Sequence, residues 1–248
     1  MSLVERSGTE IIARLRSMHE VELERFISSY VARLTSDPFK VLIATILSQN
    51  STDRVAFEAF RKLNDSIGVS PSRLARADLR RIRSAIRSAG LYRQKARTIK
   101  EVSRIVQRDF SGDLSRLLRG GVVDPRRYLT SIKGIGPKTA DVVLVTTGMS
   151  QTVPVDTHIF RISKRLGISE EGDGYEDVRS RLDSLFPPHL RHEAHLLLIT
   201  HGRRVCKPIN PHCHTCSLSS LCKYYQTKRG RYIRYMRSEE ERSLDCGL

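Results

Sequence analysis

The sequence predicts an all-α protein. Apolar residues recur at spacings of three and four residues, the pattern that collects side chains on one face of a helix. Such runs include Ile11, Ile12, Leu15 and Met18, and later Ile82, Ile86 and Ala89. Alternating β-branched residues joined by hairpin dipeptides are nearly absent, so a β-sheet is not expected. At 248 residues the chain is long enough for one large domain or two medium ones.

Two segments in the first half carry signals of helix ends. Residues 37–49 are predicted to form a buried helix, because Asp37 can cap it, Pro38 suits its first turn and apolar residues cover most sides. Residues 111–125 are predicted to contain a short helix that ends at Gly120-Gly121 before a loop.

Two later segments are also predicted helices. Residues 155–168 begin with Asp156, a natural N-cap, and stop at Gly167. Residues 192–206 are mostly apolar and lead into a group of cysteines. No repeat of the length used by solenoid proteins is evident.

The chain is strongly basic, with a net charge of +16 from 43 basic and 27 acidic residues. Residues 72–110 hold 12 Lys/Arg against 3 Asp/Glu, and residues 223–237 hold 6 against none. One such run alone is typical of a solvated helix face. Two runs and the global excess favour nucleic acid as the partner, with affinity that falls as salt rises. An anionic membrane surface is the weaker alternative, because neither run pairs its charge with a strongly apolar face.

Targeting signals are not evident in the sequence. No apolar run approaches the roughly 20 residues that span a bilayer. Residues 1–26 lack an apolar signal core, and their glutamates argue against an organelle transit peptide. We therefore expect a cytoplasmic protein, associated with the nucleoid and not with a membrane.

Four of the five cysteines fall within 17 residues with the spacing C-x6-C-x2-C-x5-C, at Cys206, Cys213, Cys216 and Cys222. Without an export signal, disulfides are not expected, and a cationic centre would make four neighbouring thiolates favourable. Zinc and a [4Fe–4S] cluster both accept four cysteines. Zinc sites usually pair two short hooks, and only one short hook is present here. The spacing therefore favours the larger cluster and leaves zinc as the alternative.

The stretch SIKGIGPKTADVVLV (131–145) places two glycines and a lysine at the start of an apolar run. It does not match the phosphate loop of nucleotide hydrolases, G-x-x-x-x-G-K-[ST]. No glycine stands five positions before Gly136, and Pro137 separates that glycine from Lys138.

A tight turn that opens a helix remains as the interpretation of this stretch. Gly134 and Gly136 are free to take positive φ, and they leave the backbone open to close approach. Such a turn aims N–H groups at an anion such as a DNA phosphate, with Ile135 as its anchor in the core. Lys138, considered by itself, is one more candidate phosphate contact.

Three motifs together resemble the endonuclease III family, DNA glycosylases and AP lyases of the helix–hairpin–helix superfamily. They are the glycine hairpin with its lysine, VDTHIFR at 155–161, and the cysteine loop after HG at 201–202. The resemblance covers roughly residues 25–225. It implies two helical domains with DNA in the cleft between them, and it favours [4Fe–4S] over zinc. The implied parts are a six-helix domain at 30–150 with the hairpin at about 128–148, a cluster domain at 1–29 plus 151–225, and a charged tail at 226–248.

The resemblance also implies the catalytic residues. Lys138 would be the nucleophile: its neutral amine attacks C1′ of the damaged nucleotide, expels the base and leaves an imine that permits β-elimination. Asp156, as an ionised carboxylate, would stabilise positive charge on the sugar and assist proton transfer, besides capping its helix. Relatives that only excise a base carry Ser or Tyr at this lysine position, so Lys138 implies a bifunctional enzyme.

Further DNA contacts follow from the same resemblance. SAGLYRQKA (88–96) matches the wedge loop, which makes Leu91 the residue inserted where a base swings out, although a core leucine is the simpler alternative. ILSQNSTD (46–53) departs from the family pattern: Asn50 rather than Gln49 replaces the glutamine that pairs with the orphaned base. The remaining candidate DNA contacts are Gln49 beside Asn50, Thr139 beside the lysine, and His158, for which a structural hydrogen bond is an equal alternative.

The leading hypothesis is therefore a monomeric base-excision-repair glycosylase and AP lyase acting on oxidised pyrimidines and abasic sites in double-stranded DNA. A mismatch-directed uracil/thymine or modified-cytosine glycosylase on the same scaffold is the second. A non-catalytic DNA-binding protein is the alternative from a different class. Two features have no assigned role: Cys246, taken as a free thiol, and the tail, either a DNA-contacting arm or disorder.

Overall fold

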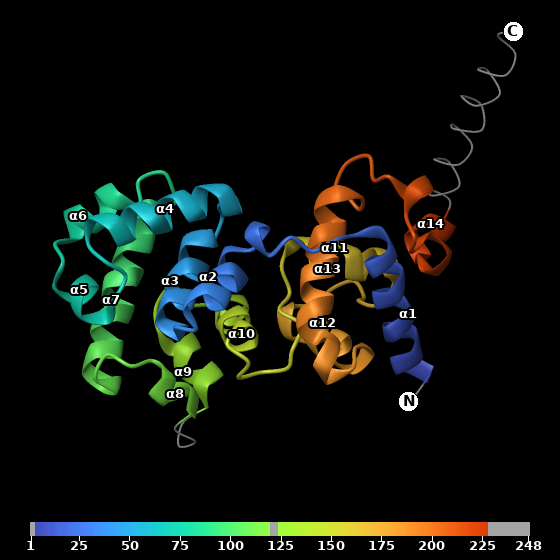
Figure 1. Cartoon of the computed structure of the whole chain (residues 1–248). Coiled ribbons are helices and arrows are strands. Elements are labelled where there is room, and N and C mark those ends of the chain that lie inside the picture. Colours follow the sequence, from blue (N-terminus) through green and yellow to red (C-terminus); the bar gives the residue numbers. More distant parts are fainter. Residues whose placement is uncertain (1–2, 120–123, 228–248) are drawn as a thin grey trace, which may run out of the picture. The chain divides into compact units, whose positions relative to one another are not determined.

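The computed structural model describes residues 3–119 and 124–227, and these residues form helices, turns and loops without a β-strand (Figure 1). The predicted all-α fold is confirmed. Within the described ranges, no helix is both long and apolar enough to cross a bilayer. Cys246 and the basic residues after Thr227 lie outside the described residues.

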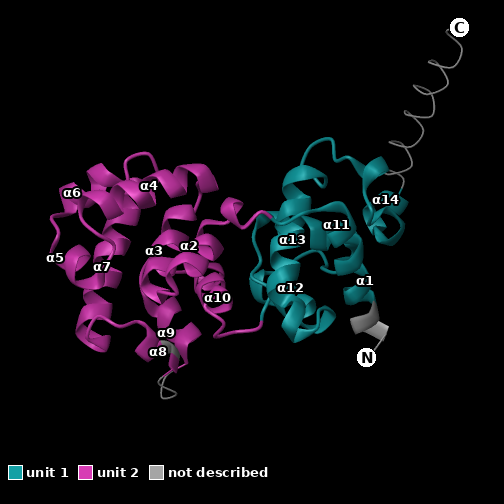
Figure 2. Ribbon diagram, viewed as in Figure 1, with its two compact units in different colours: residues 1–21, 152–248 teal, residues 22–151 magenta. Residues whose placement is uncertain are grey.

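The chain divides into two compact units (Figure 2). The first, here called the hairpin unit, is residues 22–151; the second, the cysteine unit, combines residues 1–21 with residues 152–248. The hairpin unit begins ahead of residue 30, where the sequence placed the boundary, because η1 (Leu23–Arg25) packs against α2 (Ile27–Thr35), and α2 packs against α3.

The hairpin unit surrounds one nearly all-buried helix. Its other helices enclose α3 (Pro38–Ser48), in which every residue from Val41 to Leu47 is buried. Direct packing partners of α3 are α2, α4, α7 and α10. The remaining bounds are α4 (Asp53–Ser66), α5 (Pro71–Arg76), α6 (Leu79–Ala85), α7 (Tyr92–Phe110), α8 (Ser115–Arg119), α9 (Pro125–Ser131) and α10 (Pro137–Thr146).

Local signals explain most of these boundaries. Asp37 caps α3 as predicted, accepting from the N–H groups of Phe39 at 2.9 Å and Lys40 at 3.3 Å. The short helix expected within 111–125 is α8, and the glycines proposed to end it lie outside the described residues. The apolar run through Ile82 is interrupted: α6 ends at Ala85, and residues 86–91 form turns before α7.

The cysteine unit brings the N-terminal helix together with the C-terminal part of the chain. Within it, α13 is largely buried and packs against α1 and α11, as Figure 2 shows for the teal unit. The predicted helices at 155–168 and 192–206 correspond to α11 and α13. The bounds are α1 (Leu3–Met18), α11 (Thr157–Leu166), α12 (Tyr175–Leu185), η2 (Pro188–Leu190), α13 (Arg191–Arg204), η3 (Cys213–Thr215), η4 (Ser219–Leu221) and α14 (Lys223–Gln226).

Candidate functional site

The glycine hairpin is the five-residue turn between α9 and α10. Gly134 has φ +94°, and a Cβ there would stand 2.3 Å from the hydroxyl oxygen of Thr98. Both the backbone conformation and the lack of space therefore require glycine at this position. Gly136 has φ −89° and ψ 174°, an ordinary extended backbone, and a Cβ there would meet no atom within 4 Å. Of the two glycines that were free to take positive φ, only Gly134 does so. That residue is exposed and forms the N-cap of α10.

The hairpin is anchored to the core beneath it. Ile135 is only 3% exposed, which confirms its predicted role as the anchor. The Nε2 of Gln49, at the end of α3, donates to the carbonyl oxygen of Gly134 at 3.2 Å and to the hydroxyl of Thr139 at 2.9 Å. Because the side chain of Thr139 is buried, it serves the hairpin, and only its backbone N–H remains for a ligand.

A buried ion pair fixes the two helices of the hairpin. The carboxylate of Asp141, on α10, is 1% exposed and accepts from Arg126 Nε at 2.7 Å and Nη2 at 3.1 Å. This bidentate geometry sets the angle between α9 and α10, since the guanidinium is planar. Sequence reasoning missed the pair; its only signal was one aspartate inside an apolar run.

Lys138 is the second residue of α10 and is half-buried. Among the residues that the structure describes, none forms a hydrogen bond or ion pair with its ammonium group. Because the first N–H groups of a helix have no intrahelical acceptor, those of Lys138 and Thr139 are donors at the positive end of the helix dipole. The turn therefore combines an anion-binding helix end with an uncommitted amine.

Two exposed loops lie side by side on the hairpin unit. The Asn50 loop (residues 49–52) follows α3, and the Leu91 loop (residues 86–91) precedes α7. Asn50 is exposed with φ 48°, and Leu91 is 55% exposed with φ 58°. A Cβ on Gly90 would lie 3.1 Å from the carbonyl oxygen of Asn50, so the loops are in direct contact. Leu91 is thus a surface residue, and the core alternative does not hold.

Asp156 caps α11 in the cysteine unit. Its Oδ1 accepts from the N–H groups of His158 and Ile159, both at 2.9 Å, whereas its Oδ2 accepts from no described residue. Residues 153–154, which precede Asp156, are held by hydrogen bonds to two side chains of the same unit. Asp183 accepts from the N–H of Val153 at 2.8 Å, and the ring of His195 contacts the carbonyl oxygen of Pro154 at 2.8 Å. The two backbone N–H groups therefore fix Oδ1 and hold the carboxylate in place, and Oδ2 has no donor among the described residues.

His158 is half-buried between α11 and α13. Its Nδ1 accepts from Arg161 Nη2 at 3.1 Å, and a Cβ on Gly202 would lie only 2.8 Å from the His158 Cβ. Burial lowers the pKa of His158 below its ordinary value, although the nearby Asp156 opposes this. The geometry therefore gives His158 a packing role, which was one of its two expected roles.

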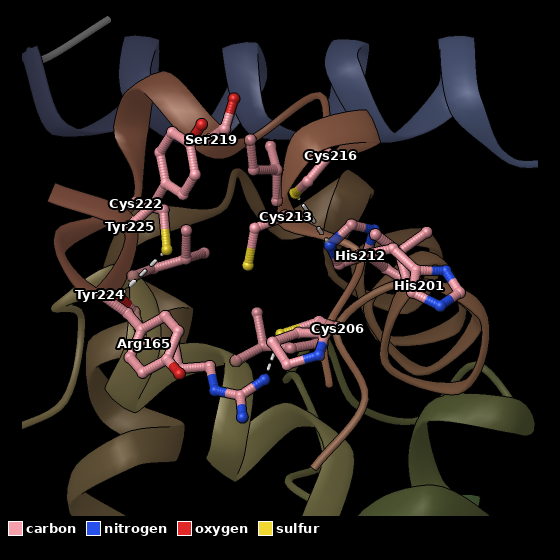
Figure 3. Close-up of a pocket in the computed structure, with 15 residues that line it drawn as sticks. Arg165, His201, Cys206, His212, Cys213, Cys216, Ser219, Cys222, Tyr224 and Tyr225 are labelled. Carbon is pink, nitrogen blue, oxygen red and sulfur yellow. Dashed lines mark hydrogen bonds between the residues drawn. The ribbon is translucent and has the colours of Figure 1, made fainter. Parts of the chain in front are cut away.

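The four clustered cysteines line one cavity of the cysteine unit. Figure 3 shows their sulfur atoms around a single open space, with Cys216 next to His201. Burial raises the pKa of Cys216 to about 11, with the other thiols adding to the effect, and burial also raises that of Cys222. Such thiols ionise only beside a cationic centre, so this donor set fits a metal centre. Across residues 3–119 and 124–227, no three His, Cys, Asp or Glu stand close enough to hold a single metal ion.

Hydrogen-bond donors approach two of these sulfur atoms. Arg165 Nη1 donates to Cys206 Sγ at 3.2 Å, and His201 Nε2 lies 3.5 Å from Cys216 Sγ. His201 Nδ1 is in turn 2.9 Å from His19 Nε2. If Cys216 is ionised by a bound cationic centre, its thiolate can only accept; His201 then donates its Nε2 proton to Cys216, and His19 donates its Nε2 proton to His201. Burial lowers the pKa of His201 to about 4, which keeps the ring neutral. These groups were missed because the contacts join distant segments.

Residues 43–188 match the model of the HhH-GPD superfamily base excision DNA repair proteins, a span that includes both the hairpin and Asp156. The chain is 41% identical to endonuclease III from Sulfolobus acidocaldarius over 219 residues, which is 88% of this chain and 96% of the relative. The chain belongs to the endonuclease III family. The resemblance inferred from the three motifs is thereby confirmed, and members of this family are enzymes of the DNA glycosylase class.

Solved structures of the endonuclease III family have the same fold. One is a non-covalent endonuclease III–DNA complex, 29% identical with a TM-score of 0.77, matching 93% of this chain and 100% of that chain. Another is a trapped endonuclease III–DNA covalent intermediate, 29% identical with a TM-score of 0.69, matching 84% of this chain and 98% of that chain.

Proposed function

We propose that this chain is a bifunctional DNA glycosylase and AP lyase that binds double-stranded DNA, removes oxidised pyrimidines and cleaves abasic sites, with Lys138 as the nucleophile. The observation that carries the proposal is the uncommitted amine of Lys138 in the first turn of α10. A lysine that served only to stabilise the fold would be paired. This one stands instead where a helix end attracts a phosphate.

The chemistry follows from an amine at that position. The neutral amine of Lys138 attacks C1′ of the damaged nucleotide, and the bond to the base breaks with its electron pair leaving on the base, which takes up a proton. Loss of the amine proton and opening of the sugar ring give an imine between Nζ and C1′. Removal of a C2′ proton then expels the 3′ phosphate by β-elimination. Hydrolysis of the imine returns the lysine.

Asp156 is the carboxylate that we assign to this reaction. A negative oxygen stabilises the positive charge that develops on the sugar as the base leaves, and it accepts and returns protons. Its Oδ1 is held by two backbone N–H groups, so Oδ2 is the oxygen for this role.

DNA contacts in the proposal come from the hairpin and the two loops. The backbone beside Gly136 is open and would accept a phosphate, whereas Ile135 contributes through its main chain because its side chain is buried. Leu91 would fill the gap left by the flipped nucleotide, and Asn50 would face the orphaned base. The relative solved in complex with DNA supports the binding, and the trapped covalent relative supports an enzyme–DNA bond.

The four cysteines, in the proposal, hold a [4Fe–4S] cluster. Two observations support this assignment: the sequence has a single short hook where zinc sites usually pair two, and the four thiols line one cavity. When bound, such a cluster would tie together the segment that follows α13, which carries all four cysteines, and would take no part in the bonds made to DNA. We also propose that a single chain suffices, because one chain carries both the nucleophile and the carboxylate.

Borohydride trapping tests the lyase proposal. Purified protein mixed with an abasic duplex and reductant should yield a covalent adduct, because borohydride reduces the imine to a stable amine. Lys138→Ala should abolish the adduct. Lys133→Ala, five positions earlier in the same hairpin and exposed, should retain it at saturating DNA. Absence of an adduct from the wild type would leave a glycosylase without lyase activity or a non-catalytic DNA-binding protein.

Substrate choice is tested separately by one excision panel. Duplexes would contain thymine glycol, dihydrouracil, a uracil–guanine pair or a thymine–guanine pair, and the released base would be measured at one enzyme concentration. The proposal expects the first two to be the preferred substrates. Preference for the mismatched pairs would instead support the alternative, a mismatch-directed glycosylase. That alternative is tested because Asn50 stands where the family has the glutamine that pairs with the orphaned base.

A further inference from the structure

We propose that Lys95 is a positioning residue that holds the Asn50 loop and the Leu91 loop together in the arrangement that reads DNA, an inference that rests on the proposed function. Lys95 lies in the first turn of α7 and is only 2% exposed. It interrupts an otherwise apolar stripe that continues with Ile99, Val102 and Val106. An ammonium group at such a position has lost its hydration and needs compensating contacts.

The side chain of Lys95 forms hydrogen bonds at two places, one just before the Asn50 loop and one within it. Its Nζ donates to the carbonyl oxygen of Leu47 at 2.8 Å and to the hydroxyl of Ser51 at 3.1 Å. Leu47 is in the last turn of α3, where carbonyl groups lack intrahelical partners and the helix dipole favours a cation. Its contacts are therefore with the end of a helix and the loop that follows it. Burial lowers the pKa of Lys95 to about 8, which marks how strongly water is excluded.

The backbone of Lys95 binds the Leu91 loop. Its N–H donates to the carbonyl oxygen of Leu91 at 3.0 Å, the first intrahelical bond of α7, so the ammonium of Lys95 extends to the Asn50 loop from the helix turn that ends the Leu91 loop. Between them, Gly90 lies against the backbone of Asn50. Leu91 has a left-handed φ of 58°, a conformation that a leucine keeps only where its surroundings enforce it, whereas the φ of 48° at Asn50 is one that asparagine adopts readily. Lys95 supplies that enforcement from beneath.

The same helix offers a matched control. Lys100 also donates its Nζ to a helix-end carbonyl, that of Ala77 at 2.5 Å, but it is half-buried and contacts neither loop. A general loss of stability from removing a lysine hydrogen bond would therefore affect both positions. A loss of loop geometry would affect Lys95 alone.

The test measures how well the two loops unstack a base, and it involves no step in which a bond to DNA is made or broken. A duplex carries an uncleavable tetrahydrofuran abasic analogue opposite 2-aminopurine, whose fluorescence rises when it is unstacked. At saturating protein, wild type and Lys100→Met should give the full rise. Lys95→Met should lose most of this rise, because loops that are no longer held together do not place Leu91 and Asn50 where they unstack the base opposite the abasic analogue. Circular dichroism and thermal melting would show that the variants are folded.

Each outcome decides the matter. An equal rise in folded Lys95→Met and wild type overturns the inference, as does an equal loss in both lysine variants. If Lys95→Met does not fold, Ser51→Ala decides: it removes one acceptor of the ammonium, and an unchanged signal in that variant overturns the inference. Failure of the proposed function is separable, since it would appear as no adduct in borohydride trapping of wild type.

Discussion

The amide nitrogen of Gln49 lies 2.9 Å from the hydroxyl oxygen of Thr139 and 3.2 Å from the carbonyl oxygen of Gly134. One side chain at the end of α3 thus donates to both sides of the glycine hairpin. The loop that follows is thereby set relative to the hairpin, and the next residue, Asn50, is exposed. Neighbouring residues in the sequence have different tasks: Gln49 supports the hairpin from inside, and Asn50 is the one available to DNA.

Gln49→Met should therefore destabilise the hairpin unit. It leaves a carbonyl and a hydroxyl without their donor, and we expect the free energy of unfolding to fall by about 1–2 kcal/mol in urea titrations. Asn50→Gly should change it by less than about 0.5 kcal/mol, because the lost side chain is exposed and glycine tolerates the left-handed φ of 48° at this position. The Asn50 variant should instead alter the preference for the base opposite the lesion. A larger stability loss from Asn50→Gly than from Gln49→Met would contradict this division.

The two hairpin glycines should respond differently to alanine. Gly134→Ala places a Cβ 2.3 Å from Thr98 in a backbone with φ +94°, and we expect about 2–4 kcal/mol of lost stability. Gly136→Ala has neither problem, so its unfolding should match wild type. Its DNA affinity should fall, because the new methyl group stands where a phosphate would approach. Equal melting temperatures for the two variants would refute this reading of the turn.

The buried ammonium of Lys95 should make stability depend on pH. Burial lowers its folded-state pKa to about 8, whereas an unfolded lysine titrates near roughly 10.4. Between these values the unfolded chain binds more protons, so the unfolding free energy of wild type should rise with pH relative to Lys95→Met. The difference in unfolding free energy between wild type and Lys95→Met should change by about 3 kcal/mol at most, and it should not depend on pH below pH ~8. Denaturant titrations of both proteins between pH ~8 and pH ~10.4 measure this difference in unfolding free energy. A difference that falls as the pH rises would contradict the prediction.

The iron content of the protein should depend on the four cysteines that line the cavity. Anaerobically purified protein should contain about four iron atoms per chain and no stoichiometric zinc by elemental analysis. Cys222→Ser should lose most of the iron, because that thiol borders the cavity. Cys246→Ser is the matched control from the same chain and should keep it. Stoichiometric zinc without iron in the wild type would overturn the cluster assignment.

Local motifs could be predicted from the sequence, and contacts between distant segments could not. The cap at Asp156 and the anchor at Ile135 depend on neighbours a few residues away, and both were anticipated. Lys95 and Leu47 meet across 48 positions, and His19 and His201 across 182. Nothing in a single sequence shows which buried polar groups will meet at such separations.

The glycines illustrate the same limit at short range. Gly134 and Gly136 look equivalent in the motif, yet only Gly134 has a positive φ. The space beside them differs as well: Thr98 on α7 stands against Gly134, whereas the space beside Gly136 is open. The residues that support the hairpin therefore had to be found in the structure, whereas the lysine that it carries was visible in the sequence.

The identity of the residue joined to DNA is the most direct test of the account. Wild-type protein would be trapped with borohydride on an abasic duplex, the DNA digested to a sugar remnant, and the modified peptide located by tandem mass spectrometry. The account predicts the remnant on the side chain of Lys138 and on no other residue. Modification at Lys133, at Lys95 or at another amine, with Lys138 unmodified, would contradict it.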